Sequence, residues 1–399
     1  MGIVFKTFFH IPVQGATTKS LLKILQYQWF CITLRQIQDD MNAQHLDIRH
    51  RIGLELAHFL QTDINRRHPL RQLFWECTLR CNVHCRHCGS DCKQLAGVKD
   101  MPREDFLRVL DSVAQKCNPH DVFVIITGGE PLLRDDLEIV GREIYERGFP
   151  WGMVTNGLLL TPERFDALCH AGLHSLTISL DGLEEEHNWL RGHNLSFQRA
   201  SAAIDTVLKH PQIAFDVVTC VNQRNFDHLA EIRDFLIDKG LKGWRLFTIF
   251  PVGRAAHDPE LQLTNVQFRQ LLDFIKQTRK EGRIHAAFGC EGYFGNYEGD
   301  VRDQFFHCQA GITVGSVMAD GAIAACASIR ADYHQGNIYE DDFMDVWENR
   351  YLPHRDRKWM RTGECAKCKH WRYCQGNAMH LRDKDGNLIL CHLKRLTQP

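Results

Sequence analysis

The stretch RQLFWECTLRCNVHCRHC, residues 71–88, decides how this chain folds and where its chemistry begins. Its first seven residues are apolar and aromatic enough to form a strand. The loop that follows directly carries Cys81, Cys85 and Cys88 in a C-x3-C-x2-C spacing. Three thiolates on one short loop can face the same metal centre. The sequence therefore predicts a metal site at the end of the first strand.

Strand and helix patterns alternate from this stretch as far as residue 281. Short, apolar, β-branched segments predict six strands, at 71–77, 121–129, 150–157, 175–182, 213–222 and 243–250. Segments with helical periodicity follow them, at 106–117, 137–147, 162–170, 196–209, 227–239 and 264–281. This alternation predicts an α/β fold, either an open doubly wound sheet or a barrel of β/α units.

The composition excludes several broad classes of protein. The chain has 399 residues and a formal net charge of −1, so we expect no nucleic-acid partner. It has no apolar run near the roughly 20 residues that a membrane helix needs, so we expect no membrane partner. Its sixteen cysteines would suit a disulfide framework only in a secreted chain, and residues 1–19 make a poor signal peptide. We therefore expect metal-binding thiols and a cytoplasmic location.

The cysteines fall into two main groups. Five of them, from Cys77 to Cys92, lie within sixteen residues, and six lie in the last quarter of the chain, from Cys308 to Cys391. A structural zinc site needs four ligands, and Cys77 or Cys92 could add a fourth thiolate to the first group. Spacing alone therefore leaves a closed zinc or four-cysteine site open beside a three-cysteine iron–sulfur cluster.

A second motif, Thr127-Gly128-Gly129-Glu130-Pro131, ends the second predicted strand. Glycines at this place let the backbone approach a ligand closely. A C-x3-C-x2-C loop after one strand and GGEP after the next resembles the radical S-adenosylmethionine (SAM) enzymes, over roughly residues 70–250. The resemblance implies a partial (β/α)6 TIM-like barrel whose polar site residues gather at the carboxyl ends of its strands.

The resemblance also implies a set of site residues. Cys81, Cys85 and Cys88 would bind a [4Fe-4S] cluster whose open iron chelates SAM. The other positions of the pattern would lie around SAM: His87, Gly128, Gly129, Glu130, Pro131, Thr155, Asn156, Ser179, Asp181, Arg191, Thr219 and Asn222. An electron from the cluster, supplied by a flavodoxin- or ferredoxin-type donor, would cleave SAM to a 5′-deoxyadenosyl radical that abstracts hydrogen.

The C-terminal cysteines resemble those of the SPASM domain, which holds auxiliary iron–sulfur clusters in radical SAM enzymes. By family roles, Cys365, Cys368, Cys374 and Cys391 would bind one outer auxiliary [4Fe-4S] cluster. Four thiolates at this spacing also suit a zinc ribbon, which stays open on the residues alone.

A second, inner auxiliary cluster is incomplete by the same pattern. Cys308 and Cys326 match its positions, but the family has a further cysteine where this chain has Ala378. Cys290 or His307 would have to fill the place. The alternatives are a smaller cluster, or two cysteines without metal.

The pattern divides the chain into three parts: an N-terminal extension over residues 1–68, the radical SAM core over 69–285, and a small Cys-rich, SPASM-like domain over 286–399. The extension contains one helix with apolar residues at helical spacing, namely Ile48, Ile52, Leu56, Phe59 and Leu60. We expect residues 1–40 to be loosely packed, or translation to start at Met41. We predict no winged-helix leader-binding module in residues 1–68.

Three hypotheses concern the substrate. SPASM-bearing enzymes mostly modify peptides or proteins, so a peptide or protein is the first choice. The segment FPVGRA, residues 250–255, is faintly similar to a branch that modifies tetrapyrrole side chains in heme pathways. A substrate rich in propionates would favour a basic pocket, and no dense basic cluster stands out, although Arg245, Arg254 and Arg283 are present. The third hypothesis is a non-catalytic electron-transfer or scaffold protein. No catalytic acid or base stands out, and Glu291 and Asp320 are two of many candidates.

Overall fold

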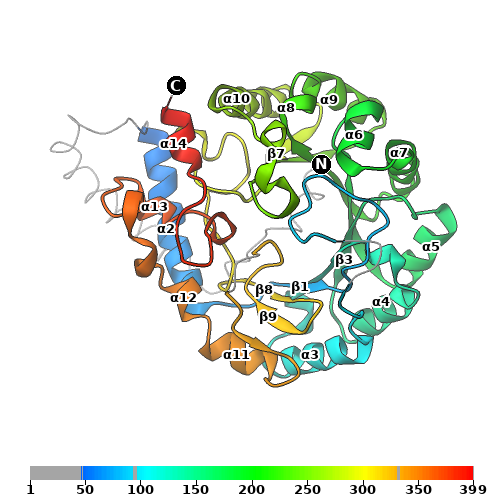
Figure 1. Cartoon of the computed structure of the whole chain (residues 1–399). Coiled ribbons are helices and arrows are strands. Elements are labelled where there is room, and N and C mark those ends of the chain that lie inside the picture. The colour runs from blue at the N-terminus through cyan, green and yellow to red at the C-terminus, as the bar shows by residue number, and fades with distance from the viewer. Residues whose placement is uncertain (1–45, 47, 93–96, 330–332, 399) are drawn as a thin grey trace, which may run out of the picture.

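A computed structural model describes residues 46, 48–92, 97–329 and 333–398. The expectations for residues 1–40 and Met41 lie outside this part of the chain. One ten-stranded sheet organises the molecule, in the order β10-β9-β8-β1-β2-β3-β4-β5-β6-β7. The sheet curls into a partial barrel, and helices surround its outer face (Figure 1).

All six strands that the sequence predicts are present and mutually parallel. They are β1 (Gln72–Glu76), β2 (Phe123–Thr127), β3 (Trp151–Thr155), β4 (Leu173–Ser179), β5 (Ala214–Val221) and β6 (Gly243–Thr248). Because consecutive parallel strands end on the same side, the loop after β1 and the GGEP segment after β2 lie at one edge of the sheet.

Four further strands extend the sheet at both ends. β7 (His285–Phe288) pairs parallel to β6, and β8 (Val314–Val317) pairs parallel to β1. β9 (Ala322–Ala324) and β10 (Gly336–Asn337) then add antiparallel partners. The sequence predicts alternating strands and helices only as far as residue 281, so these four strands were not predicted. Strands of two to four residues are too short to show a period in the sequence.

An outer layer of helices covers the sheet. It consists of α3 (Arg103–Lys116), α4 (Leu137–Glu146), α5 (Pro162–His170), α6 (Glu184–Arg191), α7 (Ser196–Val207), α8 (Gln223–Phe226), α9 (Leu229–Asp238) and α10 (Asn265–Glu281). Thr161 caps α5 by accepting from the amide of Arg164, and Pro162 occupies the first helical position, as is typical of helix starts. Sequence reasoning missed α6, although three glutamates open it and Gly192 ends it.

The core lies between the sheet and these helices. Trp75 on β1 stacks on Phe106 of α3 with ring centroids 4.4 Å apart, and Trp151 on β3 is fully buried. Gly141 on α4 makes room for it, because a side chain there would meet the indole ring at 2.4 Å. Such close packing fixes the helices on the outer face and leaves the strand ends to carry the site.

The predicted helix of the N-terminal extension is present as α2 (Ile48–Arg67), but the face that it buries is a different one. Ile48, Ile52, Leu56 and Phe59 are exposed, whereas Leu54 and Ile64 are buried. The helix packs through its small Gly53 against Phe305 and through polar contacts of Glu55 with Arg372 and Tyr373. Apolar spacing therefore identified the helix but not its packed side.

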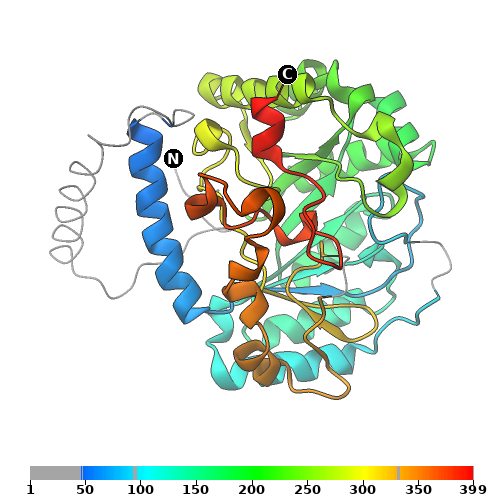
Figure 2. The same cartoon turned by 60° about the vertical axis from the view of Figure 1, so that its left-hand side comes forward.

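The C-terminal part consists of short helices beside the barrel: α11 (Phe343–Asn349), α12 (Leu352–Arg355), α13 (Trp371–Cys374) and α14 (His392–Thr397). It lies along α2 on one side and reaches α10 through α14 (Figure 2). Within the described residues, no helix is long and apolar enough to cross a membrane.

Candidate metal centre and cofactor site

The loop after β1 gathers its cysteines in one small buried cluster. Cys81 and Cys85 are buried, Cys88 is half-buried, and Val83 and Cys92 pack with them. Cys77 belongs to the main core instead. Of the two cysteines that could have added a fourth thiolate, only Cys92 therefore lies with the predicted three.

The end of α6 supports this loop from one side. The amide of His84 donates to the carbonyl of Arg191 at 3.1 Å, and the amide of Arg86 donates to the carbonyl of Leu190 at 2.9 Å. Gly192, at φ +64°, allows the approach, because a side chain there would meet the His84 carbonyl oxygen at 2.7 Å. The free carbonyls at the end of a helix thus become the acceptors that fix the loop.

The segment after β6 supports the loop from the other side. Arg254 donates from Nε to the carbonyl of Cys85 at 2.7 Å and from its amide to the carbonyl of Cys88 at 3.1 Å. A side chain at Gly253 would meet the Cys88 carbonyl oxygen at 2.6 Å. Sequence reasoning treated Arg254 as a possible substrate contact, whereas here it contacts the cysteine loop.

The environments of the three thiols differ. Burial raises the pKa of Cys81 to about 12 and also raises the pKa of Cys85. A hydrogen bond from Cys92 lowers the pKa of Cys88 to about 5. Thiolates are the metal-binding form, so loading this site at neutral pH would release protons from Cys81 and Cys85.

A buried carboxylate joins the ends of β2 and β3. Glu130 is 1% exposed and accepts hydrogen bonds from Thr155 Oγ1 at 2.7 Å, the Asn156 amide at 2.8 Å and the Leu132 amide at 3.1 Å. Burial nevertheless raises its pKa. Asn156 Nδ2 also donates to Asn82 Oδ1 at 2.8 Å, which ties this network to the cysteine loop. Asn82 was not predicted.

The glycines of GGEP serve the same junction. The Gly129 amide donates to the carbonyl of Thr78 at 2.7 Å, and the Glu130 amide donates to the carbonyl of Arg80 at 2.9 Å. A side chain at Gly129 would collide with the Arg80 carbonyl oxygen. The close approach that the sequence predicts therefore occurs between two segments of the chain itself.

A buried ion pair lies beside Cys85. Arg191 Nε is 2.6 Å from Asp181 Oδ2, and its Nη1 is 3.7 Å from Cys85 Sγ. Burial alone would raise the pKa of Asp181, but Arg191 lowers it overall. Breaking such a pair leaves one buried charge unpaired, at a cost of roughly 3–5 kcal/mol. The structure thus brings two predicted residues from distant motifs to the cluster loop.

The remaining predicted residues also lie near the strand ends. Thr219 accepts from Trp244 Nε1 at 2.8 Å, and Asn222 caps α8 in a reciprocal capping box. Ser179, the last residue of β4, is buried. Burial lowers the pKa of His87 to about 4, and its Nδ1 has no partner within the described structure. Thr219 and Asn222 thus make local structural contacts here.

The four outer cysteines lie on or beside short helical turns: Cys365 ends a turn at Gly363–Cys365, Cys374 ends α13, and Cys391 precedes α14. Burial raises the pKa of the Cys374 thiol, and the negative charges of Cys391, Cys368 and Cys365 would raise it further. Immediately after Cys374, the backbone of Gln375, Gly376 and Asn377 is left-handed at three successive residues. Arg382 Nη2 lies 3.5 Å from Cys365 Sγ. Among the described residues, no three Cys, His, Asp or Glu side chains enclose a single metal ion.

Two residues that were considered as acid or base have different surroundings. Glu291 is 2% exposed, and burial raises its pKa to about 8 while Thr248 donates to its Oε2. Asp320 is exposed, and its carboxylate accepts from the Ala322 amide in the turn between β8 and β9. Glu291 is therefore the buried one of the two.

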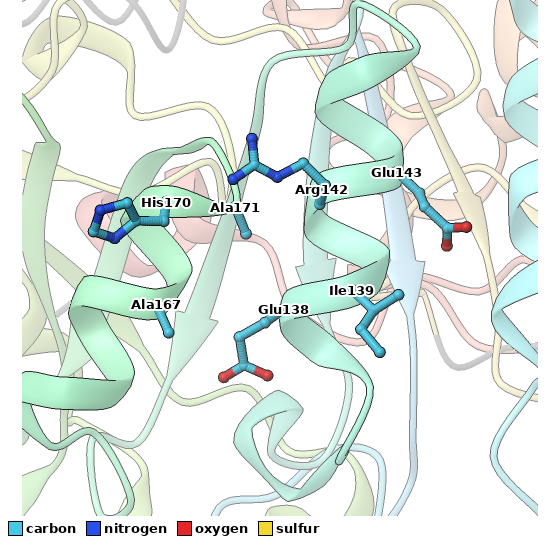
Figure 3. Close-up of a pocket in the computed structure, with 7 residues that line it drawn as sticks. All are labelled: Glu138, Ile139, Arg142, Glu143, Ala167, His170 and Ala171. Atoms are coloured by element: carbon cyan, nitrogen blue, oxygen red, sulfur yellow. The ribbon is translucent and has the colours of Figure 1, made fainter.

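One open pocket lies on the outer surface, away from the cysteines. It occupies about 350 Å³ between α4 and α5 (Figure 3). Its lining residues are Glu138, Ile139, Arg142, Glu143, Ala167, His170 and Ala171. Because it opens on the helical layer and not at the strand ends, we assign it no part in the site.

Two models of known protein families match parts of this chain. The family model of the radical SAM superfamily matches residues 75–236, and that of the SPASM iron–sulfur cluster-binding domain matches residues 308–369. The chain belongs to the radical SAM superfamily and carries a SPASM domain. Its cofactors are [4Fe-4S] clusters and SAM, and the three thiols of the loop after β1 suit a cluster with one open iron.

Individual relatives differ in what they act on. An AdoMet-dependent heme synthase of Methanosarcina barkeri is 27% identical over 324 residues, which cover 77% of this chain and 90% of that protein. The mycofactocin maturase MftC of Mycolicibacterium smegmatis is 29% identical over 329 residues, 77% of each chain. The crystal structure of Streptococcus suis SuiB bound to SAM shares the fold, with a TM-score of 0.63, 16% identity and coverage of 90% of this chain and 86% of that one.

Proposed function

We propose that this protein is a radical SAM oxidoreductase that removes hydrogen from a propionate side chain of a tetrapyrrole. The observation that carries the choice of substrate is the similarity to an AdoMet-dependent heme synthase over 90% of that protein. The tetrapyrrole hypothesis thus moves ahead of the peptide hypothesis that the sequence favoured.

When bound, the cluster and SAM would supply a 5′-deoxyadenosyl radical. The chain's own residues bind and orient them. Cys81, Cys85 and Cys88 would hold the cluster. Arg191 places a positive charge 3.7 Å from the sulfur of Cys85 and favours its thiolate form.

Arg245 is the cation that we assign to a substrate carboxylate inside the barrel. Trp244 and Leu246 of β6 are fully buried on the helical side, so Arg245 between them faces the inside of the barrel, where it is half-buried. It is ion-paired with Asp216 on β5, and its Nη2 donates to Thr177 Oγ1 at 3.0 Å. Arg283, in contrast, is exposed and lies 3.5 Å from Asp234. Arg245 is thus the basic residue that we expect to meet a propionate.

An anaerobic assay with SAM, a strong reductant and an iron porphyrin bearing propionates tests the proposal. We expect 5′-deoxyadenosine to form together with a porphyrin of lower mass, and deuterium on the propionates to appear in the deoxyadenosine. Deoxyadenosine formation without any change in the porphyrin would reject this substrate. No SAM cleavage at all would favour the non-catalytic iron–sulfur hypothesis.

Two substitutions would sharpen the role of Arg245. Arg245→Met should raise KM for the porphyrin, because it removes the cation. Asp216→Asn should lower KM, because it removes the competing carboxylate and keeps the cation. Equal effects of both variants on KM would indicate a structural ion pair only.

Peptide or protein modification is the second candidate. It is favoured by the 29% identity to a mycofactocin maturase, a slightly higher identity over a smaller share of that protein. A short peptide encoded beside this gene, modified in the same anaerobic assay, would replace the tetrapyrrole proposal.

A further inference from the structure

A buried arginine lies among the outer cysteines without a carboxylate to balance its charge. Arg382 follows the turn Met379–Leu381 and is 3% exposed. Its hydrogen-bond partners among the described residues are three backbone carbonyls and one sulfur. The adjacent carboxylate of Asp383 accepts from the amides of Asp385 and Asn387. Because a buried charge is costly unless it is paired, this guanidinium calls for a negatively charged group beside it.

Backbone carbonyls fix the guanidinium in one position. Arg382 donates from Nε and Nη2 to the carbonyl of Gly376 at 3.1 and 3.0 Å, and from Nη1 to the carbonyl of Gly386 at 2.5 Å. Gly376 has φ +85°, and a side chain there would lie 3.1 Å from Arg382 Nη2. Since Gly376 follows Cys374 by two residues, the left-handed turn after this cysteine is shaped around the arginine.

One N–H of the same guanidinium faces a thiol. Arg382 Nη2 lies 3.5 Å from Cys365 Sγ and 3.4 Å from the carbonyl of Met360, so these two acceptors share a donor. A hydrogen bond from a charged donor is stronger when its acceptor is charged as well. Metal binding, which makes Cys365 a thiolate, would therefore favour the sulfur. The arginine joins the backbone after Cys374 to the sulfur of Cys365.

The arginine beside the barrel cysteines differs in one respect. Arg191 lies 3.7 Å from Cys85 Sγ, but Asp181 at 2.6 Å balances its charge. Arg382 has no such partner, so its full charge acts on the outer cysteines. The potential of an iron–sulfur cluster depends on the net charge around it and on hydrogen bonds to its sulfurs. A nearby positive charge stabilises the reduced form, which carries one more negative charge.

We propose that Arg382 raises the reduction potential of an outer auxiliary [4Fe-4S] cluster, through its hydrogen bond to Cys365 and its unbalanced charge. Arg382 is a positioning residue, because it acts through a cysteine sulfur. The inference takes Cys365 as a ligand of that cluster. It does not depend on a tetrapyrrole substrate, so the two proposals can fail separately.

The test is a potentiometric titration of the reconstituted whole protein, followed by electron paramagnetic resonance. The outer signal is the one that Cys368→Ala lacks. Arg382→Gln removes the charge and should shift this signal to a lower potential at unchanged iron content. Arg382→Lys keeps the charge but not the planar fork, so its potential should lie between the other two.

An exposed arginine of the same region provides the matched control. Arg361 is exposed, and its guanidinium lies 5.7 Å from the centre of the Trp371 ring. Water and salt screen its charge, so Arg361→Gln should keep the native potential. The signal that Cys85→Ala lacks serves as an internal reference and should not move in any of these variants.

The outcomes separate tuning of a cluster from support of the fold. An unchanged outer potential in Arg382→Gln would overturn the proposal, as would an equal shift in Arg361→Gln. If Arg382→Gln loses about four irons, Arg382→Lys decides: a potential below the native one supports the proposal, and a native potential rejects it. Loss of about four irons in both variants would also reject it, since the arginine would then only hold the turn. So would zinc in place of iron at the outer cysteines.

Discussion

The cysteine loop after β1 and the outer cysteine group hold their thiols by different means. The first group lies on one loop, and distant segments fix that loop: the end of α6, Arg254 after β6 and Asn156 after β3. The second group spans residues 365–391 in short helical turns with three successive left-handed residues. We therefore expect the barrel to hold its cysteine loop in place without metal, and we expect the C-terminal turns to depend on the metal for their stability.

Removal of a loop cysteine should have the largest effect. Cys85→Ala should abolish formation of 5′-deoxyadenosine and lose about four irons per chain, because two thiolates do not hold the cluster in place. Anaerobic chromatography of the SAM products measures the activity. Cys169→Ala should behave as the native protein. Deoxyadenosine formation by Cys85→Ala would contradict the role given to the loop.

Removal of an outer cysteine should separate the two regions. Cys368→Ala should also lose about four irons, but SAM cleavage should persist because the barrel site is assembled without the C-terminal turns. Hydrogen exchange should rise over residues 363–391 and stay unchanged in β1 to β6. An equal rise in both regions would show that the barrel depends on the outer cluster as well.

Two buried histidines extend the comparison to pH. Burial lowers the pKa of His187 in the barrel and of His354 in α12 to about 3. In the unfolded chain the two histidines take up protons as the pH falls below their ordinary pKa of about 6.5, whereas the folded protein keeps them neutral down to about pH 3. Their contribution to the free energy of unfolding is therefore fully present above about pH 6.5 and is lost as the pH falls toward 3. Between pH 7 and pH 5 each histidine should lower the free energy of unfolding by about 2 kcal/mol.

The partners of the two rings make their substitutions differ. His187 accepts from the Asp181 amide at 3.0 Å and contacts Ser196 Oγ at 2.9 Å, whereas both ring nitrogens of His354 have no partner in the described structure. His187→Phe should therefore cost roughly 1–3 kcal/mol at pH 7, while His354→Phe should cost little. Both should flatten the pH dependence of urea unfolding midpoints. An unchanged pH dependence in His354→Phe would contradict the buried neutral ring.

Loss of Cys92 should have the smallest effect. Its thiol hydrogen-bonds Cys88, so Cys92→Ala should shift the reduction potential of the cluster and leave its iron content intact. Potentiometric titration measures the shift, and iron analysis is the control. A loss of about four irons would instead support the four-cysteine site that spacing alone left open.

Local patterns predicted much of the fold and of the first cysteine group. The strands β1 to β6 and the cap of α5 follow from periods and cap residues within a few positions of each other. The short strands β7 to β10 do not follow from local patterns, because segments of two to four residues show no period. The buried side of α2 does not follow either, because apolar spacing does not say which segment packs against the helix.

The sequence by itself determined the order of strands and helices, the three loop cysteines and the GGEP segment, since each depends on neighbours in the chain. Only the tertiary structure placed Arg254 and the end of α6 on the cysteine loop and paired Arg191 with Asp181 beside Cys85. These contacts join segments 10 to more than 160 residues apart. They are hydrogen bonds and buried ion pairs, and no local pattern in the sequence reveals them.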